Sequence, residues 1–335
     1  MGNLITSVPA IETTSWELYF KPLLADPSVS KLPFNISIGN MPRDIFFNGN
    51  ADKITGVGGS CGWSEKGDGL TFTKKTLDPV ELKAAVKQCY SVLLKKLFGD
   101  KLPNGAMRGE LSTEVVDFMT KQQSYAFNRD LLSILFLGDT GATPDDYYSL
   151  LDGVYTKLLA GVSNTDGTVD AGSISSSDVN TTNFFTTFKA IYDAQPRQLK
   201  AMPNNQKAWI WTRATYDAYL SYLQEKTQNS AGVIQTSYIT DGMNVNAFMG
   251  IPISVMDIVD ERLETDFLSG SPAAATDPYR TILTDPKNHI IMLDQNGFAN
   301  ADVFHQKKED LVWAVGSVLV DYQYGYGDLN VIAGF

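Results

Sequence analysis

The stretch TEVVDFMTKQQSYAFNRDLLSILFLG, residues 113–138, indicates the fold more strongly than any other part of the chain. Ser112 can cap a helix that begins at Thr113, and Gly138 is suited to end it. Its inner stripe is expected to include Val116, Met119, Phe127, Leu131 and Ile134. A helix of this length spans about 35–40 Å, so we expect a structural spine and not a short connector.

Upstream of this helix, residues 1–43 predict an extended arm. Five prolines prevent a long helix there, namely Pro9, Pro22, Pro27, Pro33 and Pro42. Apolar side chains such as Trp16 and Phe20 are scattered along the arm, which would be poorly solvated on its own. We therefore expect the arm to lie on a neighbouring surface, of its own chain or of another.

Residues 44–77 predict a long hairpin. The strand-like segments 44–47 (DIFF) and 69–73 (GLTFT) flank a tip that is rich in glycine. This loop also carries apolar side chains, and it cannot form a core alone: Ile54, Val57, Trp63, Leu70 and Phe72.

A helix is predicted to begin at Asp78, which can act as its cap, with Pro79 in the first position and Glu81 completing a capping-box-like pattern. Its apolar face would consist of Leu82, Val86, Cys89, Leu93 and Leu97, and Gly99 would end it. Further helices are predicted over residues 144–159 and 183–195. Between them, residues 161–182 are rich in Gly, Ser, Asn, Asp and Thr, which indicates an exposed loop or surface insertion.

The last third of the chain alternates strands with short helices. A strand is predicted over 208–212, followed by a helix that Thr212 caps and that has Tyr216, Tyr219, Leu220 and Leu223 on one face. Other predicted strands cover residues 234–239, 251–256, 289–293, 312–322 and 330–335. The predicted class is therefore α+β.

Composition limits the classes of function. The 335 residues, 43% of them hydrophobic, suffice for a large core, which we expect to be divided between two domains or to carry large excursions. With 27 basic against 38 acidic residues, the chain lacks the clustered cations that grip phosphates. An acidic wall can still enclose DNA without adhering to it. No secretory signal is visible, and the apolar stretch 311–320 is too short to span a bilayer.

No motif for catalysis, cofactor binding or metal binding stands out. Cys61 and Cys89 form no zinc pattern and indicate free thiols. His289 and His305, the two histidines, lack the partners of a nucleophile motif, and we interpret both as structural or surface residues. The glycine-rich tip has Asp68 where a phosphate-binding loop requires lysine. We expect no catalytic residue, no cofactor and no metal.

The order of these segments resembles the major capsid proteins of tailed bacteriophages, which share the Hong Kong 97 fold. The arm resembles that family's N-terminal arm, and residues 44–77 resemble its extended hairpin loop. AFNRDLLSILFLGD resembles its spine helix, and AWIWTRATYDAYLSYLQE resembles a strand and helix of its axial domain. FMGIPISVMDIVDE, NHIIMLD and NVIAGF resemble later strands of the family.

The resemblance implies a division of the chain into domains. Residues 1–43 would be the arm, 44–77 the hairpin loop, and 78–205 mainly a peripheral domain with the spine helix 113–137 and the insertion 161–182. Residues 206–283 would form mainly an axial domain. Residues 284–323 would return to the peripheral domain, and 324–335 would close the axial domain.

The resemblance also implies a structural function. Such subunits are not enzymes; they assemble with themselves into pentamers and hexamers of an icosahedral virion shell around double-stranded DNA, in the cytoplasm of a bacterial host. Scaffolding, portal and decoration proteins are the implied partners, and no membrane is involved. The arm and hairpin loop would supply inter-subunit contacts through Trp16, Phe20, Ile54, Val57, Trp63, Leu70 and Phe72.

Two alternatives stay open. An encapsulin, a bacterial compartment with the same fold, would package protein cargo and not DNA. A soluble α+β hydrolase or binding protein would be a monomer or small oligomer with a convergent polar pocket. Some members of the resembled family also join neighbours by a Lys–Asn isopeptide bond. Candidates here are Lys53, Lys66, Lys74 and Lys75, with Asn288, Asn296 or Asn300.

Overall fold

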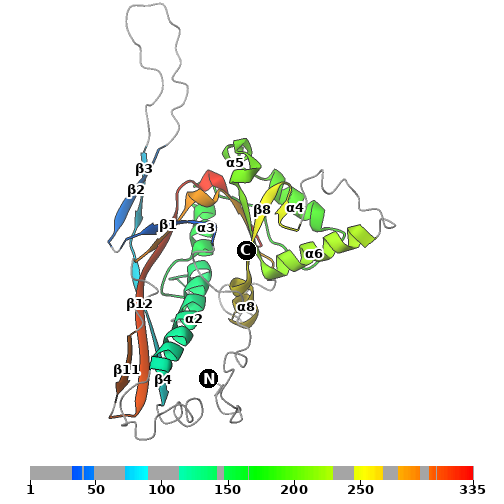
Figure 1. The fold of residues 1–335 in the computed structure, drawn as a ribbon. Helices are drawn as coiled ribbons and strands as arrows, with labels where there is room; N and C mark the ends of the chain where they lie inside the picture. The colour runs from blue at the N-terminus through cyan, green and yellow to red at the C-terminus, as the bar shows by residue number, and fades with distance from the viewer. Residues whose placement is uncertain are drawn as a thin grey trace, which may run out of the picture.

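The computed structural model describes residues 32–39, 41–48, 72–89, 113–141, 147–164, 166–228, 245–266, 278–294, 302–306 and 308–334. These residues form two β-sheets with helices packed against them, and a two-stranded hairpin that projects from one end (Figure 1). The α+β class predicted from the sequence is confirmed.

The long strand β12, Leu311–Tyr324, is the axis of the first sheet. One edge of β12 pairs along the whole of antiparallel β4, Val80–Cys89. The other edge pairs first with β11, Asp302–Gln306, and then with β10, His289–Leu293. Strand β1, Asn35–Ile38, extends the sheet as the parallel partner of β10. Strands from distant parts of the sequence, β4, β10 and β11, thus all pair with β12.

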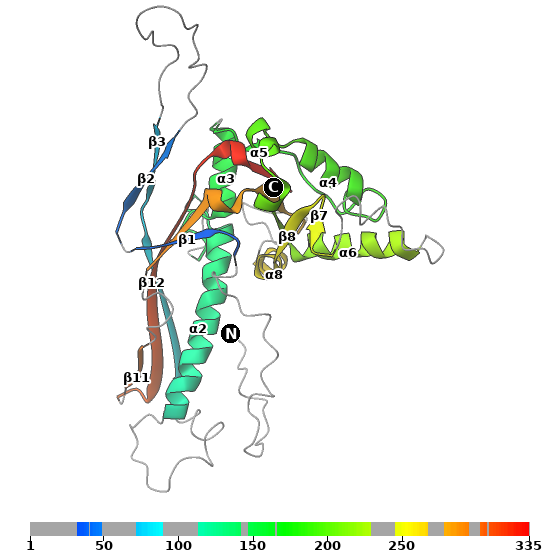
Figure 2. The same cartoon turned by 45° about the horizontal axis from the view of Figure 1, so that its top comes forward.

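Helix α2, Thr113–Leu137, lies lengthwise beside the first sheet (Figures 1 and 2), and both of its predicted ends are confirmed. Three residues of its predicted apolar stripe are buried: Met119, Leu131 and Ile134. From Leu131 onward the helix is buried on all sides, where α3, Val154–Ser163, and α8, Asp257–Asp266, pack near it.

The second sheet has the strand order β5-β13-β9-β6-β8-β7. Its strands are Val169–Asp170, Asn330–Ala333, Thr281–Thr284, Ala208–Thr212, Ile251–Met256 and Ala247–Phe248, in that spatial order. Helices α4, Phe184–Asp193, α5, Arg197–Ala201, and α6, Arg213–Gln228, supply side chains to the core on one face of this sheet. Short 3-10 helices cover Asn204–Gln206, Pro286–Asn288 and Gly327–Leu329.

Both faces of β6 are buried, because this strand lies at the centre of the second sheet. Trp209 and Trp211 point into the core that contains Phe184 of α4. Ile210, between them, belongs to the other core, together with Leu131 of α2. The alternation of tryptophans predicted a buried strand face, and the second sheet in fact separates two hydrophobic cores.

The hairpin consists of β2, Arg43–Asn48, and β3, Phe72–Leu77, which pair antiparallel from Arg43↔Leu77 to Asn48↔Phe72. The prediction of a hairpin over residues 44–77 is confirmed for these strands. Its glycine-rich tip, residues 49–71, lies outside the described residues. The two strands point away from the rest of the molecule (Figures 1 and 2).

The predicted helix beginning at Asp78 is wrong over its described part, since Val80–Cys89 form β4. Lys, Glu and Ala favour a helix locally, and an apolar residue every three or four positions fitted one. The same residues also fit an alternation of period two, in which Leu82, Ala84 and Val86 are less exposed than their neighbours. Pairing with β12 along the whole strand decided between the two.

The predicted surface insertion 161–182 is only partly exposed. Its residues Val169–Asp170 form β5, which pairs with β13 at the edge of the second sheet. Ile174 and Val179 are buried in the core beside the tryptophans, although the segment is polar on average. The first flanking helix begins at Val154, later than predicted, and residues 147–153 before it form turns and irregular structure. The other predicted strands and helices are present, except that residues 234–239 lie outside the described part.

Candidate assembly surface

Most of the predicted contact residues lie outside the described part of the chain: Trp16, Phe20, Ile54, Val57, Trp63 and Leu70. Phe72 is described as the first residue of β3, opposite Asn48, at the end of the paired hairpin strands that leads to the tip. The structure therefore shows where the paired strands of the predicted contact hairpin lie. It does not test the predicted contacts with neighbouring subunits.

The base of the hairpin is attached to the body by a charged cluster. Lys75 of β3 pairs with Asp166 at 2.8 Å, and its ammonium group lies 3.8 Å from the centre of the Tyr324 ring at the end of β12. The Tyr324 hydroxyl donates a hydrogen bond of 3.0 Å to the same carboxylate. Desolvation and the nearby Asp166 charge raise the pKa of Tyr324 well above its usual value, so this hydroxyl stays protonated.

A second contact at this base is aromatic. The rings of Phe47 in β2 and Tyr326 meet edge to face, with 5.3 Å between their centroids. Gly325 allows this approach, because a Cβ atom at that position would lie 2.4 Å from the Phe47 ring. With the Lys75 cluster, this contact holds both strands of the hairpin at their root.

Large apolar side chains are exposed near the hairpin. Ile38, Met41 and Phe46 are 63%, 72% and 65% exposed, and they lie within nine consecutive residues. Isolated exposed apolar residues are ordinary, but a group of large ones on one short segment is typical of a surface that contacts another protein. The sequence signal for it was the apolar character of this region.

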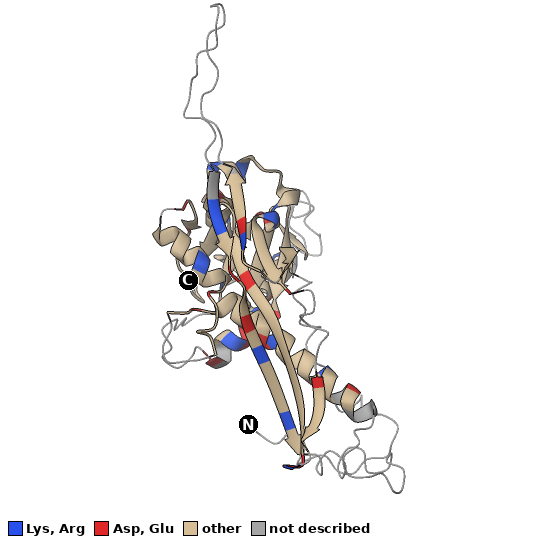
Figure 3. Cartoon of the chain, turned by 90° about the vertical axis from the view of Figure 1, so that its left-hand side faces the viewer, with Lys and Arg blue, Asp and Glu red and all other residues tan. Residues whose placement is uncertain are grey.

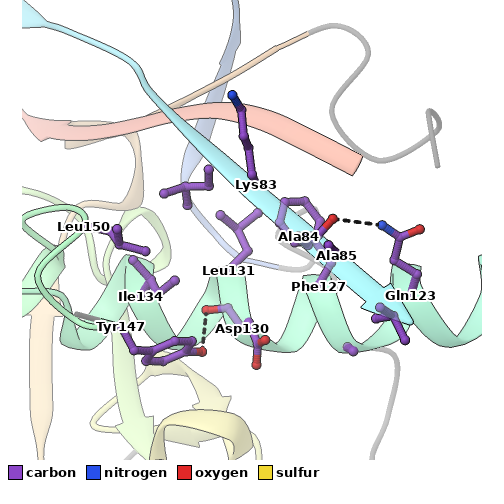
Figure 4. A pocket seen from close by; sticks show the side chains of 13 residues that line it. Lys83, Ala84, Ala85, Gln123, Phe127, Asp130, Leu131, Ile134, Tyr147 and Leu150 are labelled. Carbon is purple, nitrogen blue, oxygen red and sulfur yellow. Dashed lines mark hydrogen bonds between the residues drawn. The ribbon is translucent and has the colours of Figure 1, made fainter. Parts of the chain in front are cut away.

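A groove of about 230 Å³ lies between β4 and α2 (Figure 4). Its walls are mainly apolar: Leu82–Val86 of β4, Phe127, Leu131 and Ile134 of α2, and Tyr147 and Leu150 beyond that helix. At one end, Gln123 of α2 donates a hydrogen bond of 3.3 Å from Nε2 to the Ala84 carbonyl. Sequence reasoning missed this groove, because its strand wall had been predicted to be a helix.

Charges on the first sheet are mixed in sign. Figure 3 shows Lys and Arg interspersed with Asp and Glu along the described strands. On β4, Lys83 pairs with Glu81 at 3.2 Å, and Lys87 lies further along the same strand. This pattern is unlike the continuous basic stripe of a protein that binds nucleic acid tightly.

His289 is a structural residue, as interpreted from the sequence. It is fully buried, its Nε2 lies 2.7 Å from the Thr284 hydroxyl and 2.9 Å from the Asn330 side-chain oxygen, and its Nδ1 lies 2.6 Å from the Tyr322 hydroxyl. Burial lowers the pKa of His289 to about 3. A neutral imidazole thus links the two sheets through hydrogen bonds.

The remaining candidate residues for catalysis, metal binding or cross-linking form no common site among the described residues. His305, on β11, lies 3.6 Å from Asp310. Among the described residues, no group of His, Cys, Asp or Glu could hold a metal ion, and no helix is long and apolar enough to cross a membrane. Of the candidate isopeptide residues, Lys75 pairs with Asp166, and Asn288 is buried with hydrogen bonds to Tyr326.

Comparison with known proteins identifies the fold. No family model matches the chain, and no curated protein matches it. Solved structures match over nearly the full length. The capsid of Myoviridae Phage XM1 is 10% identical, covers 99% of both chains and superposes with a TM-score of 0.59. A capsid of an empty GTA particle is 14% identical, covers 96% of this chain and 94% of its own, and has a TM-score of 0.55.

A chain of Mycobacterium phage Ogopogo is 14% identical, covers 90% of this chain and 89% of its own, and has a TM-score of 0.53. These likenesses confirm the Hong Kong 97 type of fold that the resemblance implied. At such low identity they show the shared fold and do not by themselves transfer a function.

Proposed function

We propose that this chain is a structural subunit of a tailed-phage type of head shell and not an enzyme. The observation that carries the proposal is the likeness of the fold to the capsid of Myoviridae Phage XM1 over 99% of both chains. Among the described residues, no group of His, Cys, Asp or Glu could hold a metal ion.

The exposed surface supports assembly. Phe46, Met41 and Ile38 expose apolar area around the hairpin, and covering it against a neighbour would contribute about 25 cal/mol per Å². Repetition of such a contact around a ring multiplies its effect, so a modest contact per subunit suffices. We propose that pentamers and hexamers of this chain close into an icosahedral shell.

The contents and partners follow from the same proposal. The shell would enclose double-stranded DNA without reading its sequence, since a net charge of −11 disfavours tight phosphate binding. Scaffolding, portal and decoration proteins would be its further partners. The subunits would assemble in the bacterial cytoplasm and reside in the virion.

The predicted domain division and contact residues belong to this proposal. The first sheet and α2 would form the peripheral domain, and the second sheet with its helices the axial domain. Trp16 and Phe20 of the arm, and the predicted apolar residues of the hairpin from Ile54 to Phe72, would contact neighbouring subunits.

Negative-stain microscopy tests the proposal, with the chain purified alone and co-expressed with its upstream open reading frame. Closed shells, or rings of five and six subunits, are expected, and a monodisperse monomer under both conditions would contradict the proposal. Phe46→Asp should reduce the yield of particles, because it places a charge on the exposed apolar surface. Ser221→Asp, at an exposed position on α6, is the matched control and should assemble normally.

The contents of purified particles separate a phage shell from a compartment of the encapsulin type. Nuclease-protected double-stranded DNA in particles made during infection supports the proposal. Packaged protein without DNA would instead favour the compartment.

A further inference from the structure

We propose that residues Trp16–Phe20 of a neighbouring copy dock in the groove between α2 and β4, as an antiparallel strand added to the free edge of β4. This inference rests on the proposed function, because it requires copies of the chain to stand side by side. It assigns a specific surface to the predicted arm contacts.

The groove has the dimensions of one short strand. From Gln123 to Ile134 its helical wall spans about 16 Å, at 1.5 Å per residue. The strand wall, Leu82–Val86, has five residues and spans about the same length at 3.3 Å per residue. A five-residue extended segment therefore fits along both walls.

No described strand pairs with the edge of β4 that faces the groove. Among the described residues β12 is the strand that pairs with β4, and it covers the opposite edge. On the groove side, the Ala84 carbonyl accepts from the side chain of Gln123. Gln123 is only 2% exposed, and its Oε1 has no partner within the described structure. The backbone of an added strand supplies donors and acceptors to such an edge.

The arm contains a segment with the matching pattern. In SWELYFK, residues 15–21, Trp16, Leu18 and Phe20 alternate with Glu17, Tyr19 and Lys21. In a strand these two sets point to opposite faces. Trp16, Leu18 and Phe20 would face α2, on the same side as the less exposed residues of β4. The more polar set, Glu17, Tyr19 and Lys21, would lie on the outer face.

The charges are compatible with the following register. An antiparallel strand with Lys21 opposite Glu81 places Leu18 opposite Ala84, so apolar side chains fall beside apolar ones. It also places Glu17 opposite Ala85, diagonal to Lys83 and Lys87 of the same strand. A parallel strand that sets Glu17 opposite Lys83 would set Lys21 against Lys87, two like charges.

A neighbouring copy, and not the same chain, is the expected donor. Each copy would offer a free strand edge to one neighbour and insert its own arm strand at the edge of another neighbour. Such head-to-tail contacts repeat from copy to copy until a ring closes. The arm joins the body at Leu32, buried in the same core as Leu82 and Leu131 of the groove. The residues from 21 to 31 can extend about 36 Å, about twice the length of the groove, so the arm can pass beyond its own groove toward another copy.

Disulfide trapping between copies tests the proposal. Cys61 and Cys89 are first replaced by Ser, and Leu18→Cys subunits are then mixed with Ala126→Cys subunits during assembly. Mild oxidation of the particles should yield a covalent dimer that neither variant forms alone. Leu18→Cys mixed with Ser221→Cys, on distant α6, is the control and should yield none.

The possible results distinguish failure of the docking inference from failure of the proposed function. Intact particles without the dimer would overturn this inference and leave the proposed function standing. A cross-link that forms within a chain carrying both cysteines, and never between chains, would also overturn it. Failure to form any particle by microscopy, with subunits folded by circular dichroism, would contradict the proposed function itself.

A charge exchange at exposed positions provides a second test that does not depend on cysteines. Glu81→Lys should raise the subunit concentration needed for assembly by about threefold, and Lys21→Glu should act similarly. Combining the two changes should restore assembly, because the pair is re-formed with its signs reversed. Additive losses in the double variant would reject the proposed register.

Discussion

The ammonium group of Lys75 lies 3.8 Å from the centre of the Tyr324 ring, and this contact joins the hairpin to the end of β12, the longest strand in the described part of the chain. Both residues also bond the carboxylate of Asp166, which follows α3 in the chain. The angle at which the hairpin leaves the body is thus set by three segments that meet at one point.

Removing the Lys75 charge should loosen the hairpin. In Lys75→Met, a cation–π contact and a partly buried ion pair are lost, at a cost of about 1 kcal/mol, so amides of Arg43–Phe47 should exchange about fivefold faster. Hydrogen exchange monitored by mass spectrometry measures this. Lys74→Met is the control, because Lys74 and its partner Asp44 are 54% and 39% exposed and contribute little. Equal acceleration in both variants would argue against a role for Lys75.

His289 should make stability depend on pH. Burial lowers its pKa from 6.5 to about 3, so the unfolded chain binds more protons than the folded one between these values. The free energy of unfolding is therefore highest above pH 6.5. It falls as the pH is lowered, and at pH 5 it is smaller by about 2 kcal/mol. Urea unfolding at pH 7 and pH 5 should show a smaller loss for His289→Gln than for the unaltered chain. The same loss in both would mean that another group is responsible.

The two buried tryptophans of β6 should differ in their response to phenylalanine. Trp209 donates from Nε1 to the Phe248 carbonyl at 3.3 Å, whereas Nε1 of Trp211 has no partner within the described structure. Trp209→Phe removes this hydrogen bond, whereas Trp211→Phe removes none, so Trp209→Phe should cost about 1 kcal/mol more. Denaturant unfolding of the two variants, matched in size and burial, gives the difference. A larger loss at Trp211 would contradict the assignment of the hydrogen bond.

Two glycines with positive φ should tolerate alanine unequally. Gly334 has φ of +89°, and a Cβ atom there would lie 2.0 Å from the Tyr279 carbonyl oxygen. Gly172 has φ of +96°, and its Cβ atom would meet open space. Gly172→Ala should therefore cost about 1 kcal/mol for backbone strain, and Gly334→Ala about 3 kcal/mol or more. Thermal unfolding measures both, and similar shifts would indicate that the backbone near Tyr279 yields easily.

Where local signals agreed with packing, the sequence predicted the structure closely. The cap at Ser112, the helical periodicity and the stop at Gly138 predicted α2 with both of its ends correct. The alternation of Trp209 and Trp211 predicted a buried strand. These signals act over a few residues, so they can be recognised without knowing how the chain folds.

The errors arose where two local patterns were equally satisfied. Residues 80–89 fit a helix by propensity and a strand by alternation, and ten residues of pairing with β12 decided in favour of the strand. The polar segment 161–182 concealed Ile174 and Val179, two apolar residues that suffice to bury it partly against the tryptophan core.

Local patterns and composition sufficed to predict the spine helix, the buried central strand, the strands of the hairpin and the lack of clustered basic residues, because each depends on neighbours in the chain or on composition. Only the tertiary structure decided that Val80–Cys89 is a strand, that Lys75 meets Asp166 across 91 positions of the chain, and that a groove lies between β4 and α2. Such contacts join distant segments, and their free energy becomes available only when the whole chain has folded.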